Sequence, residues 1–316
     1  MSSKQYAVVG GQAVMEGIMM RSPVRSVLAV RTPSGEIVTE EMQSRSIREK
    51  VPFLRIPILR GCVAFVESMI VGYKSLIRSA ELAGLDEETK GNKFLNGLIT
   101  GVSMILGVGI AVGLFMLLPQ WIGKLFQQSF PDARALRILI EGVVRIALFL
   151  LYITATSLMK EMKDLYRYHG AEHKTIAAVE AHEELTVENI RPKSRFHCRC
   201  GTSFIFLVFL FSILFFTLLH AFVLPADLEG FVRFLVHLAF LPVVAGFTFE
   251  IQQWTGRHDN WFTRAVSAPG KALQRLTTAE PTDRQIEVAI AAMNESLRNE
   301  SGEVDFSLAI KKKENK

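Results

Sequence analysis

Four long apolar runs dominate the pattern of hydrophobic and polar positions along the chain. Each is about 20 residues long, enough for a helix to cross a hydrocarbon core of about 30 Å. Because an extended segment cannot satisfy its backbone polar groups in lipid, the runs predict membrane-spanning helices. They cover residues 96–118, 138–159, 201–224 and 231–249.

The first two runs contain features that helices use to associate in lipid. The first carries two Gly-x-x-x-Gly pairs, which let helix backbones approach closely, although glycine is also simply common in membrane helices. In the second, Glu141 and Arg145 stand four residues apart. Since an unpaired charge inside a membrane is costly, we expect these two side chains to pair with each other.

Residues 53–82 show a different pattern. Charged residues recur there every seven positions on a largely apolar background: Arg60, Glu67, Lys74 and Glu81. One narrow charged stripe predicts a helix that lies in the membrane interface, or one that packs into the bundle with its stripe toward a wet cavity.

The two ends of the chain have patterns typical of an extramembrane domain. Residues 26–41 predict a β-hairpin around Pro33-Ser34-Gly35. The preceding stretch "VVGGQAVMEGIMMRSP", which Gly10-Gly11 and Gly17 punctuate, predicts a tight turn followed by a strand. After Pro281, apolar residues at helical spacing predict a further helix, with a face formed by Ile286, Ala289, Ile290, Met293 and Leu297.

These patterns together predict an α-helical polytopic membrane protein with about four transmembrane helices, an interfacial amphipathic helix and a small N-terminal β element. We expect a β-hairpin domain over 1–52, the interfacial helix over 53–93, spans one and two over 94–160, a loop with a candidate metal motif over 161–200, spans three and four over 201–252, and a C-terminal helix and tail over 253–316.

Composition agrees with this class, and the basic residues set the orientation. Of the 316 residues, 49% are hydrophobic, and the first residues lack the apolar stretch of a signal peptide. Residues 160–199 contain eight Lys or Arg, so the positive-inside rule places that segment and both termini in the cytoplasm. The net charge of +5 then reflects loops near anionic lipid, and no nucleic-acid partner is expected.

The stretch "YHGAEHK", residues 168–174, is the strongest chemical signal. In a helix, His169, Glu172 and His173 project from one face. Two imidazoles can hold one metal ion, and the carboxylate can act as a base toward water. The order His-x-x-Glu-His is the inverted form of a zinc-protease signature. The simpler alternative is an interfacial helix end with hydrogen-bonded histidines.

A catalytic zinc ion usually has a third protein ligand and one open position. The histidine motif follows span two, "RFHCRCGTSF" precedes span three and Glu250 ends span four, so the topology brings all three to one membrane face. His197, Cys200 and Glu250 are therefore candidate third ligands. Each candidate also has a simpler explanation. Cys200 can be a small buried residue at the start of a helix, and His197 can be a cation near the lipid headgroups. Glu250 can form an ion pair with Arg257 or His258.

The remaining cysteines and histidines add little to this interpretation. Three cysteines, an odd number with two in a segment expected to be cytoplasmic, do not form a disulfide framework. His182, His220 and His237 have no clustered partners in the sequence and are assigned no role.

Six blocks, spread in order over nearly the whole chain, resemble the DUF1385 family of bacterial membrane proteins. They are "VVGGQAVMEGIMMRSP", "RIPILRGCVAFVESM", "YHGAEHKTIAAVEA", "LTVENIRPKSRFHCRCGTSF", "LPVVAGFTFEI" and "APGKALQRLTTAEPTDRQIEVAIAA". Members are commonly described as predicted metal-dependent enzymes. The resemblance therefore implies a multi-pass protein of the bacterial inner membrane with a metal site, but supplies no substrate.

The resemblance also assigns expected positions. It places the family's histidine pair on His169 and His173, the acidic partner on Glu172, and its His-Pro-Arg-Cys-Gly block on residues 197–201. Cys198 stands where the family usually has proline, which leaves open which sulfur binds a metal. Gln12 and Glu16, in the "GGQAVMEG" block, are expected to cap the same site.

Three functions remain compatible with the sequence. The first is a hydrolase that depends on a metal, with Zn2+ expected and Glu172 as the base, acting on a lipid-linked substrate or a membrane peptide. The second is a non-enzymatic scaffold, assembly factor or regulator with a structural metal or none. The third is a transporter, with Glu141, Arg145 and the glycine-rich first span lining a path through the membrane. Four spans without visible repeats argue against a transporter unless the chain forms a homo-oligomer.

Overall fold

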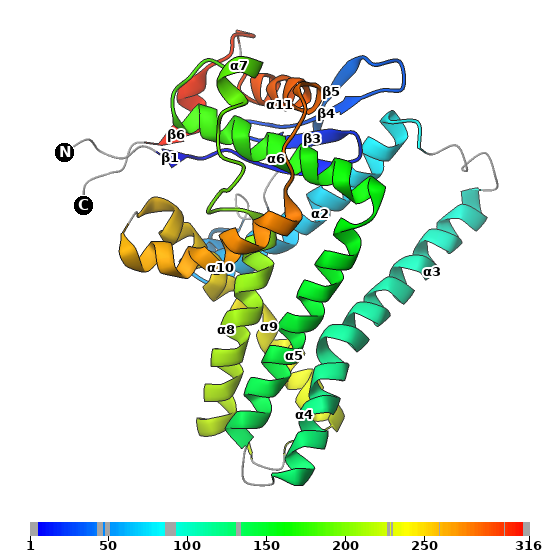
Figure 1. Cartoon of the computed structure of the whole chain (residues 1–316), viewed down its shortest axis with the longest axis vertical. Coiled ribbons are helices and arrows are strands. Elements are labelled where there is room, and N and C mark those ends of the chain that lie inside the picture. Colours follow the sequence, from blue (N-terminus) through cyan, green and yellow to red (C-terminus); the bar gives the residue numbers. More distant parts are fainter. Residues whose placement is uncertain are drawn as a thin grey trace.

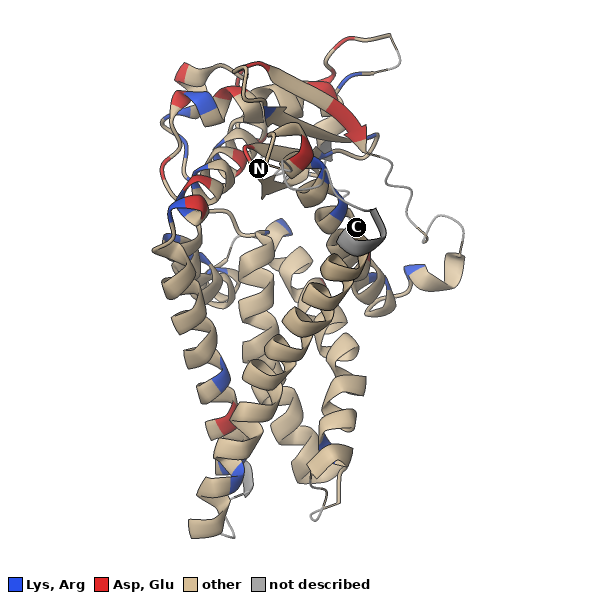
Figure 2. Ribbon diagram, turned by 90° about the vertical axis from the view of Figure 1, so that its right-hand side faces the viewer, with Lys and Arg blue, Asp and Glu red and all other residues tan. Residues whose placement is uncertain are grey.

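A computed structural model of the chain describes residues 6–42, 47, 51–85, 93–130, 134–225, 228, 230–258, 260–299 and 301–311. Long helices form a bundle at one end of the molecule, and a small sheet with helices packed on it forms an extramembrane domain at the other (Figure 1). Charged residues are concentrated in the domain and are sparse along the bundle (Figure 2).

Within these described ranges, four helical segments are long and apolar enough to cross a membrane, which confirms the predicted number of spans. They are Gly97–Ser129, Leu136–Ser157, Gly201–Phe222 and Gly230–Arg257. The last three correspond to α5 (Arg134–Ser157), α8 (Gly201–Phe222) and α9 (Gly230–Arg257).

The first span is longer than its apolar run. It consists of α3 (Lys93–Val112), a π-helical turn (Gly113–Leu117) and α4 (Leu118–Ser129), so the helix continues beyond residue 118. Pro119 lies just after the π-helical turn and has no N–H to donate to the carbonyl four residues earlier, at Phe115, so that oxygen is available to another donor. The glycines of the Gly-x-x-x-Gly pairs have no other group near their Cβ positions, so these pairs make no close helix contact within the described chain.

Inside the bundle, the predicted pairing of Glu141 with Arg145 is wrong. Glu141 instead accepts hydrogen bonds from Arg137 Nε at 3.0 Å and Arg233 Nη2 at 2.8 Å. Arg145 Nε donates to the Phe115 carbonyl at 2.7 Å. The reason is geometric: Arg137 is also four residues from Glu141, and the π-helical turn presents a carbonyl to Arg145.

The extramembrane domain is built on an antiparallel sheet in the order β2-β3-β4-β5. Its strands are β2 (Gly10–Val14), β3 (Gly17–Arg21), β4 (Ser26–Arg31) and β5 (Ile37–Met42). The hairpin between β4 and β5 confirms the turn at residues 33–35. The tight turn expected in the stretch before the hairpin lies at Met15-Glu16 and is followed by β3 from Gly17, whereas Gly10 and Gly11 lie within β2.

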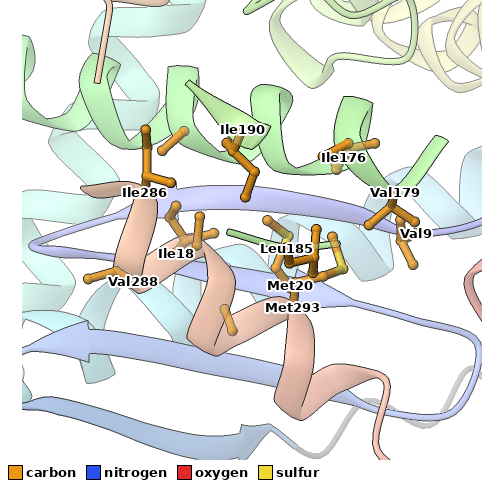
Figure 3. Close-up of a cluster of buried hydrophobic side chains, with 14 of the residues drawn as sticks. Val9, Ile18, Met20, Ile176, Val179, Leu185, Ile190, Ile286, Val288 and Met293 are labelled. Atoms are coloured by element: carbon orange, nitrogen blue, oxygen red, sulfur yellow. The ribbon is translucent and has the colours of Figure 1, made fainter. Parts of the chain in front are cut away.

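Both faces of this sheet are covered, which explains why neighbouring residues of β3 are all buried. Ile18 and Met20 face α6 (Lys160–Glu180) and α11 (Asp283–Ser296), and the cluster they join is drawn in Figure 3. Met19 faces the opposite side of the sheet. There it joins a second buried cluster, and Leu76 of α2 (Leu59–Leu82) packs against that cluster. The domain therefore has three layers, with the sheet in the middle.

The helix α2 connects the sheet to the bundle. Besides its sheet contacts, it packs along α9, where Gly61 and Gly246 bring the two backbones close together. It exposes an apolar face made of Val66, Met69, Ile70, Tyr73 and Ile77. Such a face on a helix next to the spanning segments fits the predicted interfacial position.

The remaining elements surround the junction between domain and bundle. Half of the segment expected as a loop over 161–200 is the helix α6, followed by the short α7 (Val187–Ile190). After α9, α10 (Trp261–Thr277) leads back toward the bundle, and α11 buries the predicted apolar face against the sheet. A 3-10 turn (Pro52–Arg55) precedes α2, another (Phe306–Ala309) follows α11, and β1 (Tyr6–Ala7) pairs with β6 (Ile310–Lys311).

Candidate metal centre

The helix α6 buries the histidine motif at the junction between the domain and the bundle. His173 is 1% exposed and Glu172 5%, whereas His169 is partly exposed. The two imidazole rings have centroids 4.4 Å apart, so they lie on one face of the helix, as their spacing predicts. The helix can approach its neighbours closely because Gly170 lies directly against the backbone of Ala279.

Backbone carbonyls fix the orientation of both rings. His169 Nδ1 lies 2.8 Å from the Thr277 carbonyl oxygen, and His173 Nδ1 lies 2.6 Å from that of Arg195. A carbonyl oxygen only accepts, so each Nδ1 must carry the hydrogen when the ring is neutral. Each Nε2 is then left with a lone pair. Metal-binding histidines usually have this outer hydrogen bond, which sets their tautomer.

Cys200 completes the group from a different part of the chain. Its Sγ lies 3.2 Å from His169 Nε2. Donor atoms of His169, His173 and Cys200 all lie within 4.8 Å of one another. Cys200 is the N-cap residue of α8, so the thiol stands at the positive end of a membrane-spanning helix.

Electrostatic coupling makes the sulfur a good ligand. Burial would raise the pKa of the Cys200 thiol, but His169 and His173 together outweigh burial and hold that pKa well below its usual range. Burial would lower the pKa of His169, yet the adjacent sulfur raises it to about 9. The thiolate is the form of cysteine that binds metals and acts as a nucleophile.

Glu172 lies between this group and the sheet. Its carboxylate accepts a hydrogen bond from the Gly11 backbone N–H in β2. Burial raises the pKa of Glu172, against the smaller opposing effect of His169 and His173. A raised pKa brings a carboxyl closer to neutral pH, where it can both accept and release a proton.

Gly11 is needed for this arrangement. A Cβ at residue 11 would lie 2.8 Å from Glu172 Cγ, whereas a Cβ at Gly10 would meet nothing within 4 Å. Gly11→Ala is therefore expected to displace Glu172 and to lower the free energy of unfolding by about 1–3 kcal/mol, the usual cost of overpacking. Thermal unfolding of the purified protein checks this, with Gly10→Ala as the matched control. Equal melting temperatures for the two variants would contradict the close packing at Gly11.

His197 and Cys198 lie beside the group but outside it. The His197 ring centroid is 5.6 Å from that of His173, and its Nε2 lies 3.6 Å from Glu180 Oε1. Burial lowers the pKa of His197. Burial raises the pKa of Cys198, so the two thiols of the Cys-x-Cys differ, and Cys200 is the sulfur in the cluster.

Glu250 does not reach the group. Its carboxylate accepts hydrogen bonds from Arg60, with Nε and Oε1 2.6 Å apart. The sequence placed Glu250 at the end of the fourth span, but α9 continues to Arg257 and residue 250 faces α2. From α9 it is Gln252 that approaches the site, donating from Nε2 to the Cys200 carbonyl at 3.0 Å.

The two residues expected to cap the site have other contacts. The Gln12 amide lies against Gly72 of α2. Glu16, in the turn between β2 and β3, accepts a hydrogen bond from the Tyr168 hydroxyl at 3.1 Å. Glu16 therefore contacts α6 one residue before His169, and Gln12 packs between the sheet and α2.

Several contributors to the site carry no sequence signal. The contacts of Thr277 and Arg195 with the histidines use backbone carbonyl oxygens. The Gln274 side chain accepts a hydrogen bond from the His197 backbone N–H and donates one to the His197 carbonyl oxygen.

The pair of His220 and His237 was also not predicted, although their Nε2 atoms lie 2.9 Å apart inside the bundle. Only the packing of α8 on α9 brings these two histidines together.

The donor set fits a zinc ion. Zn2+ prefers neutral imidazole and thiolate ligands. The ion would take the place of the proton that His169 shares with the Cys200 sulfur. Among the described residues the cluster offers three donors, which leaves a fourth position for water or substrate, as catalytic zinc sites require. A closed structural site would use four protein ligands.

Comparisons with known proteins identify the family of the chain. A family model described as "Protein of unknown function (DUF1385)" matches residues 56–299, a range that contains His169, Glu172, His173 and Cys200. "Uncharacterized protein YqhQ" of Bacillus subtilis (strain 168) is 34% identical over 302 residues, covering 92% of this chain and 93% of that protein. No solved structure matches. With the match covering most of its length, the chain belongs to the DUF1385 family.

Proposed function

We propose that the chain is a zinc-dependent hydrolase whose site faces the cytoplasmic side of the bacterial inner membrane. The observation that carries the proposal is the cluster of His169, His173 and Cys200, with donor atoms within 4.8 Å and both imidazoles held by backbone carbonyls. His169 Nε2, His173 Nε2 and Cys200 Sγ would hold the ion. Zinc with three protein ligands acts as a Lewis acid and makes water more acidic.

In this proposal Glu172 is the general base. It is buried next to both histidines, its pKa is raised by burial, and the Gly11 N–H orients its carboxylate. A base must take a proton from water and return it to the leaving group, and a carboxylate with a raised pKa accepts that proton more readily. The partly exposed side of the cluster, at His169, is the side from which substrate would enter.

The location of the site suggests the class of substrate. Cys200 directly precedes the spanning helix α8, so the cluster lies level with one end of the bundle. The basic segment around it supports a cytoplasmic orientation through the positive-inside rule. A substrate held at that depth would be lipid-linked or would be a membrane peptide near its point of exit from the bilayer.

Glu172→Gln separates catalysis from metal binding. The variant is expected to keep about one zinc ion per chain, while zinc-dependent hydrolysis falls by about 10²–10⁴-fold, the usual contribution of a general base. Hydrolysis is measured on a panel of chromogenic esters, phosphate esters and fluorogenic peptides in lipid-containing micelles. Glu161→Gln, at the exposed start of α6, is the matched control. Unchanged hydrolysis in the Glu172 variant would remove that residue from the mechanism.

A non-enzymatic role with a structural metal is the competing function. It predicts a zinc ion with four protein ligands and no hydrolysis of any substrate class. The cluster of three donors favours the open site over this alternative.

One contact favours a second chemistry at the same site. Cys200 Sγ and His169 Nε2, 3.2 Å apart at a helix N-terminus, have the arrangement of an activated cysteine nucleophile. Alkylation by iodoacetamide distinguishes the two chemistries. The zinc proposal predicts slow alkylation of Cys200 as purified and rapid alkylation after chelation. Rapid alkylation of the protein as purified without chelators, at a rate that neither chelation nor added zinc changes, would favour the nucleophile.

A further inference from the structure

The outward face of α10 combines positive charge with the absence of acidic residues. Between residues 260 and 278 the sequence has Arg264, Lys271 and Arg275 but neither Asp nor Glu. Spacings of seven and four residues place the three cations on one stripe of the helix, and all three are exposed. The opposite side is buried and consists of small and uncharged residues: Thr263, Ser267, Gly270, Leu273, Gln274 and Thr277.

Large aromatic residues stand beside this stripe. Trp261 is 79% exposed and Phe262 48%, and Phe262 contacts Trp254 at the end of α9 with ring centroids 5.9 Å apart. The third tryptophan of the chain, Trp121, is 60% exposed on α4, at the opposite end of the bundle (Figure 1). Tryptophan is enriched at both interfaces of a membrane, so these residues mark the two ends of the spanning region.

Contacts with α8 set the depth of α10. Gly270 lies against Ser203, and Leu273 joins the cluster that Phe206 packs against. Since α8 begins at Gly201 and rises 1.5 Å per residue, these contacts fall within about 9 Å of its start. Because α8 is about as long as the hydrocarbon core is thick, these contacts place α10 at the boundary between the core and the headgroup layer.

We propose that the outward face of α10 binds anionic phospholipid headgroups in the leaflet next to the extramembrane domain. Arg264, Lys271 and Arg275 attract the lipid phosphates, and Trp261 with Phe262 holds the helix in the interface. A helix that its neighbours hold at the boundary of the hydrocarbon core, with only cations among the charged residues of its sequence, is complementary to an anionic lipid surface.

The same helix forms part of the candidate metal centre. Its last residue, Thr277, accepts the hydrogen bond of His169 Nδ1, and Gln274 holds His197. A lipid phosphate on α10 would therefore lie next to the site that we propose for hydrolysis. The lipid proposal does not depend on zinc or on activity, so the two can fail separately.

Fluorescence quenching of Trp261 tests the proposal. In the full chain, Trp121→Phe and Trp254→Phe leave Trp261 as the sole tryptophan. This protein is reconstituted into phosphatidylcholine vesicles that contain the same mole fraction of brominated phosphatidylcholine or brominated phosphatidylglycerol. Both lipids are expected to quench Trp261, and the anionic one at least about twofold more strongly, because the cations enrich it at α10.

The variant Arg264→Gln/Lys271→Gln/Arg275→Gln is expected to abolish the preference, so that both lipids quench equally. Continued quenching by brominated phosphatidylcholine shows that the helix of this variant still lies in the membrane. The control Arg191→Gln/Arg284→Gln/Arg298→Gln removes the same charge around α7 and α11, on the side of the domain away from the bundle, and should keep the preference (Figure 1).

Three results would overturn the proposal. Quenching by neither lipid would place α10 outside the membrane, where a protein partner is the alternative. Equal quenching in the protein with its cations intact would show that they do not select lipid. A preference that persists in the α10 triple variant would assign the selection to other residues. Zinc content, measured on the same samples, reports on the metal centre independently.

Discussion

Replacing His173 with alanine is expected to reduce the zinc content of the purified protein from about one ion per chain to near zero. His173 is 1% exposed, and its Nδ1 already donates to the Arg195 carbonyl, so its Nε2 has the fixed direction that a ligand needs. Its loss leaves one imidazole and one thiolate, too few protein donors for a stable zinc site. Mass-spectrometric metal analysis after purification without chelators measures the change.

His182→Asn is the matched control for this variant. His182 is exposed, lies in the turn after α6 and has a positive φ of 58°, a conformation that asparagine tolerates well. It should retain the zinc content of the unaltered protein. Equal zinc in the His173→Ala protein would mean that the ion is held elsewhere, and the cluster on α6 and α8 would lose its proposed role.

Glu141→Ala is expected to have the largest effect on stability. Glu141 is 2% exposed within the bundle and accepts hydrogen bonds from Arg137 and Arg233, which come from two different spans. Removing one partner of a buried ion pair typically costs about 3–5 kcal/mol, because the remaining charges stay in a medium that solvates them poorly. We expect the melting temperature in detergent to fall by roughly 10 °C.

Leu139→Ala, two residues earlier on α5, is the control for loss of side-chain volume. Leu139 is 47% exposed on the surface that faces lipid, so its truncation should shift the melting temperature little. Comparable shifts in the two variants would show that the network around Glu141 does not hold α5 and α9 together.

The spans and the histidine pair could be predicted because their signals are local. A charge-free run of about 20 residues has few structural solutions in lipid, and residues four apart on a helix share a face whatever surrounds them. The convergence of Cys200 with His169 also followed from topology, since successive spans must return to the same membrane face.

The errors arose where a contact depends on how helices pack. Glu250 was expected at the site because the apolar run ends there, yet α9 continues for two further turns and turns that carboxylate toward Arg60. Arg233 could not be chosen as the partner of Glu141, since the two residues are 92 positions apart. The carbonyl groups that orient the histidines have no side-chain signature at all.

X-ray absorption spectroscopy at the zinc edge of the full-length protein tests the central claim most directly. The arrangement of His169, His173 and Cys200 predicts about two nitrogen neighbours at about 2.0–2.1 Å and about one sulfur neighbour at about 2.3 Å, with the sulfur signal lost in Cys200→Ser. A protein without zinc, or a zinc ion with no sulfur neighbour, would contradict it.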